Sequence, residues 1–313
     1  MSLKQTYQSR KQLLVQNLET MGVTGYDEDD GLTTLINAVL EISPSPTPTV
    51  DSLTLAKTAG KQILSYADKT SGSGNTEYCT VTATALDSNN QGVSGQSVVF
   101  KVGTTTVATE TTDSNGEASY TYTSQGSGDV VLSAECSSLI QTYGVYDYLK
   151  YDDCSTDKTS NYSKSTGASF SFNTDHYELG GTNVSADVLS TLDNVRFEVL
   201  LKHNNNAGGI MVEQSFSTYD DNAFGLYNNA SNSTYLAKFP WQNVKSQNNV
   251  TNNTDYYRYI LEVSGDNITA TIENSSGTSL FTGTTSMSLS AKHYCLFTPA
   301  NTMNIKEIIV KPL

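Results

Sequence analysis

From residue 51 to the C-terminus, apolar and polar residues alternate with a period of two, in short runs that polar turn sequences separate. This period places successive side chains on opposite faces of a β-strand, so each run predicts a strand with one buried face. Seven runs fall before residue 149: "QILSYA", "YCTVTATAL", "SVVFKV", "TTVATET", "EASYTYT", "VVLSAEC" and "IQTYGVYDY". Seven short strands joined by turns such as "DSNNQG" and "DSNG" predict a β-sandwich over residues 51–148.

The alternation continues from residue 151 with longer strands, and residues 149–313 therefore form a second domain. Along "NVRFEVLLKH", one face carries Val195, Phe197, Val199 and Leu201. The other face carries Arg196, Glu198, Leu200 and Lys202. One side of this strand is predicted to be core and the other largely solvated. A chain of 313 residues that is rich in Tyr and Gly and poor in charged residues fits a mainly β protein with more than one core.

The first 42 residues have a different period. Residues 3–22 carry apolar side chains at spacings of three, four and seven, which predicts an amphipathic helix. A second helix is predicted after the acidic run Asp27 to Asp30, which suits a helix N-terminus and is less typical of a metal site. Two short helices cannot bury a core alone, so residues 1–42 are predicted to be an attachment or oligomerisation segment. Alternating prolines in "SPSPTPTV" then make residues 43–50 an extended linker.

Charge and hydropathy exclude several classes of partner. The net charge of −14 leaves no basic patch for nucleic acid, and it disfavours an anionic membrane surface. No run approaches the roughly 20 apolar residues of a membrane span, and the N-terminus lacks the apolar core of a secretory signal. The chain is therefore expected to stay in the cytoplasm, to leave by a route that the sequence does not reveal, or to leave the cell with an assembled particle.

The segment from Ile63 to Cys136 resembles the bacterial Ig-like modules of invasin-type adhesins. The resemblance is carried by "DSNNQGVSGQSVVF", which fits D-x-x-x-x-x-V-x-G-x-x-V-x-F, and by "TDSNGEASYTY". Relatives of this family occur in surface adhesins of archaea and in exposed proteins of prokaryotic viruses. The resemblance implies an immunoglobulin-like sandwich that acts as a spacer and presents another domain.

Most of residues 149–313 resembles the concanavalin A-like jelly roll of lectin and laminin-G-type modules. The resemblance is carried by an opening "YDDCSTDKTSNYSKSTGASFSFNTDHYELGG", a late hairpin "YYRYILEVSGDNITATIEN" and a closing "HYCLFTPANTMNIKEIIVKP". It implies two packed sheets whose concave face and rim loops often hold glycans. The predicted fold class is thus a helical hairpin, an Ig-like β-sandwich and a jelly-roll β-sandwich.

Four cysteines are candidates for two disulfides. Cys79 and Cys136 lie in phase with core residues on the second and sixth runs, where the Ig resemblance implies an inter-sheet bridge, although two separate buried thiols remain an alternative. The jelly-roll resemblance implies that the first and last strands lie side by side, so that Cys154 and Cys295 could also pair.

Sugar binding needs an aromatic face for the apolar side of a pyranose and polar groups for its hydroxyls. One segment with predicted rim loops supplies both kinds of residue: Tyr219, Asp220, Asp221, Asn222, Tyr227, Tyr235 and Trp241. The alternative is that these aromatic residues belong to the core or to sheet edges. No cofactor is predicted, except that Asp152 with Asp153, or Asp220 with Asp221, could hold a structural calcium ion or simply lie in solvated loops.

An enzyme is not predicted. Glycoside cleavage needs two carboxyl groups held close together, whereas the glutamates of the C-terminal domain are scattered: Glu178, Glu198, Glu213, Glu262, Glu273 and Glu307. Only Glu262 has a second acid nearby, Asp266, which lies in a turn sequence. The three histidines accompany no nucleophile motif.

The sequence therefore favours a non-enzymatic virion surface protein, a fibre, tail or capsid decoration, that displays a carbohydrate-binding domain for host recognition. Its expected partners are a host cell-surface glycan and a virion or surface scaffold that residues 1–42 contact. Self-association is expected as well, with a trimer favoured, and the expected location is the virion surface or another extracellular site. A purely structural shaft or decoration protein, a cellular surface adhesin and a glycoside hydrolase are the alternatives.

Overall fold

A computed structural model of the protein describes residues 3–20, 24, 34, 48–66, 77–190, 193–205, 208–214, 223–229, 231, 233–239 and 242–313. The helix predicted near the N-terminus is α1 (Leu3–Thr20), whose last residue donates a hydrogen bond from Thr20 Oγ1 to the Gln16 carbonyl at 2.8 Å. All of the second predicted helix except residue 34, and most of the proline-rich linker, lie outside the described residues. In the part of the chain that the structure describes, no helix is long and apolar enough to cross a membrane.

The first sandwich packs a three-stranded sheet against a five-stranded one. The three-stranded sheet has the order β1 (Ser52–Gly60), β3 (Tyr78–Leu86), β6 (Glu117–Thr123). The five-stranded sheet has the order β2 (Ile63–Ser65), β8 (Leu139–Tyr148), β7 (Gly128–Cys136), β4 (Ser97–Val102), β5 (Thr105–Thr111). The β2–β8 pair is parallel and the other pairs are antiparallel. Alternate residues such as Val81, Phe100 and Leu132 fill the space between the sheets, as the period of two predicts.

All seven runs predicted in this region are strands, and the structure adds β1. In β1 only Leu53 is buried, and most of the other side chains are partly or fully exposed. β1 is an edge strand that pairs with β3 alone, and its apolar alternation is short, because it is limited to Leu53 and Leu55.

The second sandwich is a jelly roll of two large antiparallel sheets. The seven-stranded sheet has the order β10 (Ser163–Lys164), β13 (Val184–Ser190), β22 (His293–Thr298), β15 (Gly208–Glu213), β16 (Ala223–Asn228), β17 (Ser233–Lys238), β18 (Gln242–Asn248). The eight-stranded sheet has the order β11 (Ser169–Asn173), β12 (His176–Gly180), β23 (Thr302–Pro312), β14 (Val195–His203), β19 (Tyr257–Ser264), β20 (Asn267–Glu273), β21 (Ser279–Ser286), and β9 (Lys150–Asp152) also pairs with β23. A short 3-10 helix, η1 (Thr159–Asn161), precedes β10. The predicted fold class of a mainly β chain with two sandwiches is confirmed.

The core of the jelly roll lies between its two sheets and shows the predicted alternation. Val195, Phe197, Val199 and Leu201 of β14 are all buried in it, opposite inward residues of the seven-stranded sheet such as Leu226. The outward residues of β14 instead form ion pairs on the far side of the eight-stranded sheet: Arg196 Nε lies 2.6 Å from Glu198 Oε1.

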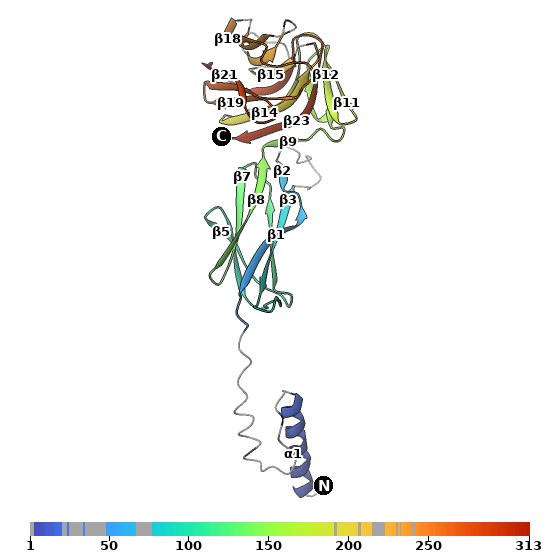
Figure 1. Ribbon diagram of the computed structural model, residues 1–313, viewed down its shortest axis with the longest axis vertical. Coiled ribbons are helices and arrows are strands. Elements are labelled where there is room, and N and C mark those ends of the chain that lie inside the picture. The colour runs from blue at the N-terminus through green and yellow to red at the C-terminus, as the bar shows by residue number, and fades with distance from the viewer. Residues whose placement is uncertain are drawn as a thin grey trace.

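The two sandwiches are joined end to end with one residue, Leu149, between β8 and β9 (Figure 1). The Tyr151 amide donates to Ser65 Oγ at 3.1 Å across this junction. The ammonium group of Lys311, near the C-terminus, lies 5.7 Å from the centre of the Tyr148 ring. The first and last strands of the jelly roll lie side by side, with Tyr151 opposite Ile309.

Candidate functional site

The outward face of the seven-stranded sheet carries an unusual number of buried apolar side chains. Ile210 and Val212 point into the main core, and alternation therefore places Met211 on the other face of β15. Here Met211 joins a separate cluster with Ala223, Tyr227, Ala237, Phe239, Cys295 and Phe297. A sheet face that points away from the core usually carries solvated side chains, so this cluster marks the face as specialised.

Three aromatic rings are stacked in a row on this face. The ring centres of Tyr227 and Tyr235 are 5.7 Å apart at an interplanar angle of 25°. Tyr227 stacks on Phe239 in the same way, at 5.9 Å and 26°. The edge of Phe297 meets Tyr227 at 5.8 Å and 88°. Burial, with a further contribution from the nearby Tyr235, raises the pKa of Tyr227, so its phenol stays protonated at neutral pH.

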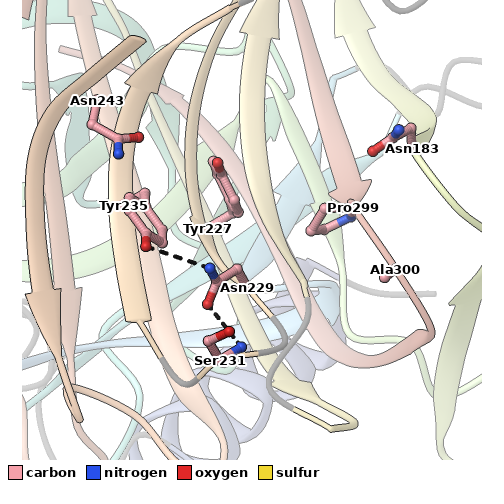
Figure 2. Close-up of a pocket in the computed structure, with 8 residues that line it drawn as sticks. All are labelled: Asn183, Tyr227, Asn229, Ser231, Tyr235, Asn243, Pro299 and Ala300. Atoms are coloured by element: carbon pink, nitrogen blue, oxygen red, sulfur yellow. Dashed lines mark hydrogen bonds between the residues drawn. The ribbon is translucent and has the colours of Figure 1, made fainter. Parts of the chain in front are cut away.

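One end of this row opens into a pocket of about 400 Å³ (Figure 2). Its described lining residues are Asn183, Tyr227, Asn229, Ser231, Tyr235, Asn243, Pro299 and Ala300. Pockets that hold small organic ligands have volumes of roughly 300–1,000 Å³, so the volume suits a sugar unit. The pocket combines aromatic rings with amide and hydroxyl groups and has no charged side chain among its described lining residues.

The hairpin between β16 and β17 fixes one amide in the pocket. Asn229 Oδ1 accepts hydrogen bonds from the amides of Ser231 and Ser233 at 2.9 and 3.2 Å, which is the geometry of an Asx turn. Asn229 Nδ2 is thereby directed toward Tyr235 Oη at 3.4 Å (Figure 2). The turn therefore fixes the side-chain amide of Asn229 beside the Tyr235 hydroxyl.

The other wall comes from distant parts of the sequence. Asn183 precedes β13 and has a φ of 52°, a left-handed conformation that asparagine tolerates better than most residues. Pro299 and Ala300 follow β22, the strand that pairs with β13. The backbone N–H of Asn183 donates a hydrogen bond to the Pro299 carbonyl at 3.2 Å. Strand pairing thus joins segments that are more than 100 residues apart along the chain.

Only two of the seven residues predicted to bind sugar can be placed. Tyr227 and Tyr235 lie in the pocket. The others lie outside the described residues: Tyr219, Asp220, Asp221, Asn222 and Trp241. The lining residues that were not predicted are Asn183, Asn229, Ser231, Asn243, Pro299 and Ala300. Asn183, Pro299 and Ala300 could not be found by distance along the chain, because their proximity to the tyrosines depends on strand pairing.

A polar cluster lies on the same face, two residues before Phe297 on β22. Cys295 Sγ lies 3.2 Å from Glu213 Oε1 and 3.9 Å from Asp187 Oδ1, and His293 Nδ1 lies 3.3 Å from Asp187 Oδ2. Burial raises the pKa of Asp187 and, with both neighbouring carboxylates, raises the pKa of the Cys295 thiol well above its usual value. The thiol is therefore a protonated donor to the carboxylates.

Glu213 is thus not isolated, as its place in the sequence suggested. The pair Asp187 and Glu213 nevertheless differs from the carboxyl pair of a glycosidase, which needs room for the scissile bond between the two groups. Here the buried thiol of Cys295 occupies that space.

Three further glutamates of the C-terminal domain form ion pairs on the outward face of the eight-stranded sheet. Arg196 contacts Glu198 and Glu262, while Arg258 contacts Glu198 and Glu307. In this network a guanidinium group holds Glu262.

Asp152, one of the calcium candidates, is a buried hydrogen-bond acceptor. Its Oδ2 accepts from Tyr162 Oη at 2.7 Å and from Tyr177 Oη at 2.9 Å, and its Oδ1 accepts from the Cys154 amide at 2.9 Å. Asp153 instead accepts from the hydroxyl and the amide of Ser155. Among the described residues, no group of three or more His, Cys, Asp or Glu side chains is arranged to hold a metal ion.

All four cysteines are free and buried, so neither expected disulfide is present. Cys154 belongs to the main core between the sheets, whereas Cys295 lies on the outward face of the seven-stranded sheet, and the backbone of that sheet separates them. The predicted pairing of the first and last strands is confirmed, because β9 pairs with β23. Cys295, however, lies on β22, the strand before the last.

Cys79 and Cys136 both face the core of the first sandwich, as predicted, but toward opposite ends of it. Cys79 lies opposite Tyr122 on the neighbouring strand β6, and the Tyr122 hydroxyl donates to Asp147, which lies opposite Gly128, the first residue of β7. Cys79 is therefore at the end of the sandwich where β7 begins. Cys136 is the last residue of β7, about 26 Å from Gly128 at roughly 3.3 Å per residue. A disulfide requires Cα atoms within about 7 Å of each other.

A second pocket, of about 380 Å³, lies on the first sandwich between β5 and β6. Its described lining includes Val107, Tyr120 and Gln125 with several threonines. Tyr122 also lines it, but the hydroxyl of this residue is already bound to buried Asp147. This pocket exposes less polar surface for recognition than the one on the jelly roll.

Residues 64–145 match the family model described as Bacterial Ig-like domain (group 1). The match covers most of the first sandwich and confirms the bacterial Ig-like resemblance of its sequence. No curated protein matches the sequence of the chain.

Several solved structures are similar to the chain at low identity. The carbohydrate-binding module CBM66 from Bacillus subtilis is 9% identical, and the match covers 48% of this chain and 94% of that one with a TM-score of 0.40. Lectin I-B4 from Griffonia simplicifolia is 10% identical over 50% of this chain and 94% of the lectin, with a TM-score of 0.38. A candidate glycosyl hydrolase from Parabacteroides distasonis is 10% identical over 52% of this chain and 100% of that one, also with a TM-score of 0.38.

Proposed function

We propose that the protein is a non-enzymatic recognition protein whose C-terminal jelly roll binds a glycan in the pocket beside Tyr227 and Tyr235. The observation that carries this proposal is the combination, in one pocket, of stacked tyrosine rings and amide groups held by a turn and by strand pairing. An aromatic ring binds the apolar face of a pyranose, and amides can both donate to and accept from its hydroxyls.

The first sandwich acts as the spacer that presents this site. It continues into the jelly roll through a single residue, and the contact between Tyr151 and Ser65 ties the two domains together. A spacer attached in this way holds the recognition domain at a fixed orientation, which suits a protein that works at a surface.

We further propose that this surface belongs to a virion of a prokaryotic virus, with residues 1–42 as the attachment segment and a trimer as the assembled form. The modular order of helix, Ig-like spacer and jelly roll supports this role. Light scattering on the full chain and on residues 43–313 tests it, because a trimer is expected for the former and a monomer for the latter. A monomeric full chain would contradict self-association.

Replacing Tyr235 with alanine is expected to weaken glycan binding at least ~10-fold, since aromatic residues at the centre of a binding site commonly contribute 2 kcal/mol or more. The full chain is first screened on a glycan array, and the strongest binder is then titrated against both proteins by calorimetry. Tyr235 is only partly buried, so the variant is expected to retain its fold and thermal stability within a few degrees.

Tyr256→Ala is the matched control. Tyr256 lies under Lys202 and Lys306, which belong to strands of the eight-stranded sheet, and it is absent from the described lining of the pocket. This variant should bind glycan as the unmodified protein does. Equal losses in both variants would contradict the proposed site, and no binding to any glycan would favour a purely structural role.

A further inference from the structure

We propose that the pocket on the jelly roll selects neutral glycans and rejects those that carry carboxylate, sulfate or phosphate groups. This inference rests on the proposed function and names the class of ligand. It follows from where the positive charges of the domain lie, because recognition of an anionic sugar in a protein pocket generally depends on Arg or Lys.

The described lining of the pocket contains amides, hydroxyls and aromatic rings but no Lys or Arg. The residues of the domain outside the described ranges cannot supply one either, wherever they lie. They are Thr191, Leu192, Asn206, Ala207, residues 215–222, Ala230, Asn232, Pro240 and Trp241, and none of them is basic. Their only ionisable acids, Asp220 and Asp221, would add negative charge.

The arginines of the domain are engaged on the opposite side of the sandwich. Arg196 and Arg258 pair with glutamates on the outward face of the eight-stranded sheet. Both guanidinium groups are therefore remote from the pocket and already neutralised by carboxylates.

The lysine nearest in sequence to a lining residue also turns away from the pocket. Lys245 follows Asn243 by two residues on β18, but its register opposite Leu236 places it on the inward side of the sheet. There its ammonium group donates to the Thr282 carbonyl and lies 5.1 Å from the centre of the Phe281 ring. Thr282 and Phe281 belong to β21 of the other sheet.

Negative charge, by contrast, shares the face with the pocket. Asp187 and Glu213 flank Cys295, with a single imidazole, that of His293, beside Asp187, and two residues further on Phe297 contacts the ring of Tyr227. The chain as a whole carries a net charge of −14. An anionic sugar would therefore lose the water around its charged group, gain no cationic partner in the pocket and be repelled by the nearby carboxylates. A neutral sugar loses only the water bound to its hydroxyl groups, and hydrogen bonds from the pocket amides replace that water.

The test compares matched glycans that differ by one acidic group, such as a galactose-terminated oligosaccharide with and without a terminal sialic acid, on the array and by calorimetry with the full chain. Neutral members of each pair are expected to bind at least ~10-fold more tightly. Equal or tighter binding of the acidic members would overturn the proposed selectivity but leave glycan binding intact. No binding of either member, in any pair, would overturn both.

The variant Asn243→Lys tests the same claim by adding the missing charge. Asn243 is exposed and its position opposite Ala237 is on the outward face, so the substitution should not disturb the fold. The preference for neutral over acidic members should shrink severalfold, and the change should vanish at high salt because screening removes it. Asn243→Gln is the uncharged control and should keep the preference. An unchanged preference in the lysine variant would overturn the electrostatic explanation.

Discussion

Replacing Asp147 with alanine is expected to lower the free energy of unfolding of the Ig-like sandwich by about 2–5 kcal/mol. Asp147 is fully buried near the junction with the jelly roll. Its carboxylate accepts hydrogen bonds from Tyr122 Oη at 2.7 Å, Ser124 Oγ at 2.6 Å, the Gln125 amide at 2.8 Å and the Ser127 amide at 3.1 Å. Alanine would leave four buried or half-buried donors without their acceptor.

The pKa of Asp147 shows that these bonds outweigh the cost of burial. Burial alone raises the pKa of this carboxyl, yet the hydrogen bonds from the two hydroxyls and the two amides lower it below its ordinary value. The folded protein therefore stabilises the ionised form, and that contribution is present at neutral pH and is lost as the pH falls through the lowered pKa.

Chemical denaturation of the full chain, followed by a signal from the first sandwich, measures this effect. Asp129→Ala on β7 is the control, because Asp129 is exposed and should change stability by less than about 0.5 kcal/mol. A loss below about 1 kcal/mol in the Asp147 variant would show that the buried carboxylate does not hold the junction end of the sandwich together.

Acid is expected to destabilise the jelly roll through His203, by about 3 kcal/mol between pH 6.5 and pH 4. His203 is fully buried at the end of β14, where its Nε2 lies 2.7 Å from Thr251 Oγ1. Thr251 accepts from Asn228 Nδ2 at 2.6 Å, and Asn228 Oδ1 in turn accepts from Tyr259 Oη at 3.0 Å. His203 Nδ1 has no hydrogen-bond partner among the residues that the structure describes. This network offers no carboxylate to stabilise a protonated ring.

Burial accordingly lowers the pKa of His203 to about 4. Above pH 6.5 the ring is neutral in the folded and the unfolded chain. As the pH falls below 6.5, the unfolded chain binds a proton that the folded chain refuses, so stability declines until the folded ring is protonated near pH 4. Carboxyl groups whose pKa is lowered, such as Asp147, lose their contribution at lower pH, and the raised pKa of Asp187 acts in the opposite direction.

His203→Gln should flatten the stability of the jelly roll between pH 6.5 and pH 4, because an amide does not titrate there. Thermal unfolding at half-unit pH steps measures this. His176→Gln is the control, since His176 pairs with the exposed Asp175 at the rim and takes no part in the buried network. An acid-induced loss of equal size in the His203 variant would contradict this assignment.

The strands that were predicted are those that local alternation marks. The core positions of β3 and β14 follow directly from residues such as Val81 and Phe197 on the buried face. The edge strand β1 was missed because only Leu53 is buried in it, and an edge strand needs no apolar pattern to pair.

The pocket was only partly predictable. Tyr227 and Tyr235 are close in sequence and on paired strands, so a search for clustered aromatic and polar residues finds them. Asn183 and Pro299 meet only because β13 pairs with β22, a register that a single sequence does not specify. The cluster of Glu213, Asp187 and Cys295 was hidden for the same reason.

The cysteines show where a family resemblance stops being informative. The jelly-roll resemblance predicted the fold correctly, but not the disulfide between Cys154 and Cys295. The two thiols lie on opposite faces of the seven-stranded sheet, so a bridge would have to pass through its backbone. A core position on a predicted strand establishes which face a thiol occupies, and not which partner it meets.

A crystal structure of the full chain with the neutral oligosaccharide that binds most tightly tests whether the protein recognises a sugar in the pocket bounded by Tyr235, Asn229 and Asn183. We expect a pyranose against the Tyr235 ring with hydroxyls within hydrogen-bond distance of the Asn229 or Asn243 amides. A sugar bound on the outward face of the eight-stranded sheet, or in the pocket between β5 and β6 of the first sandwich, would contradict it.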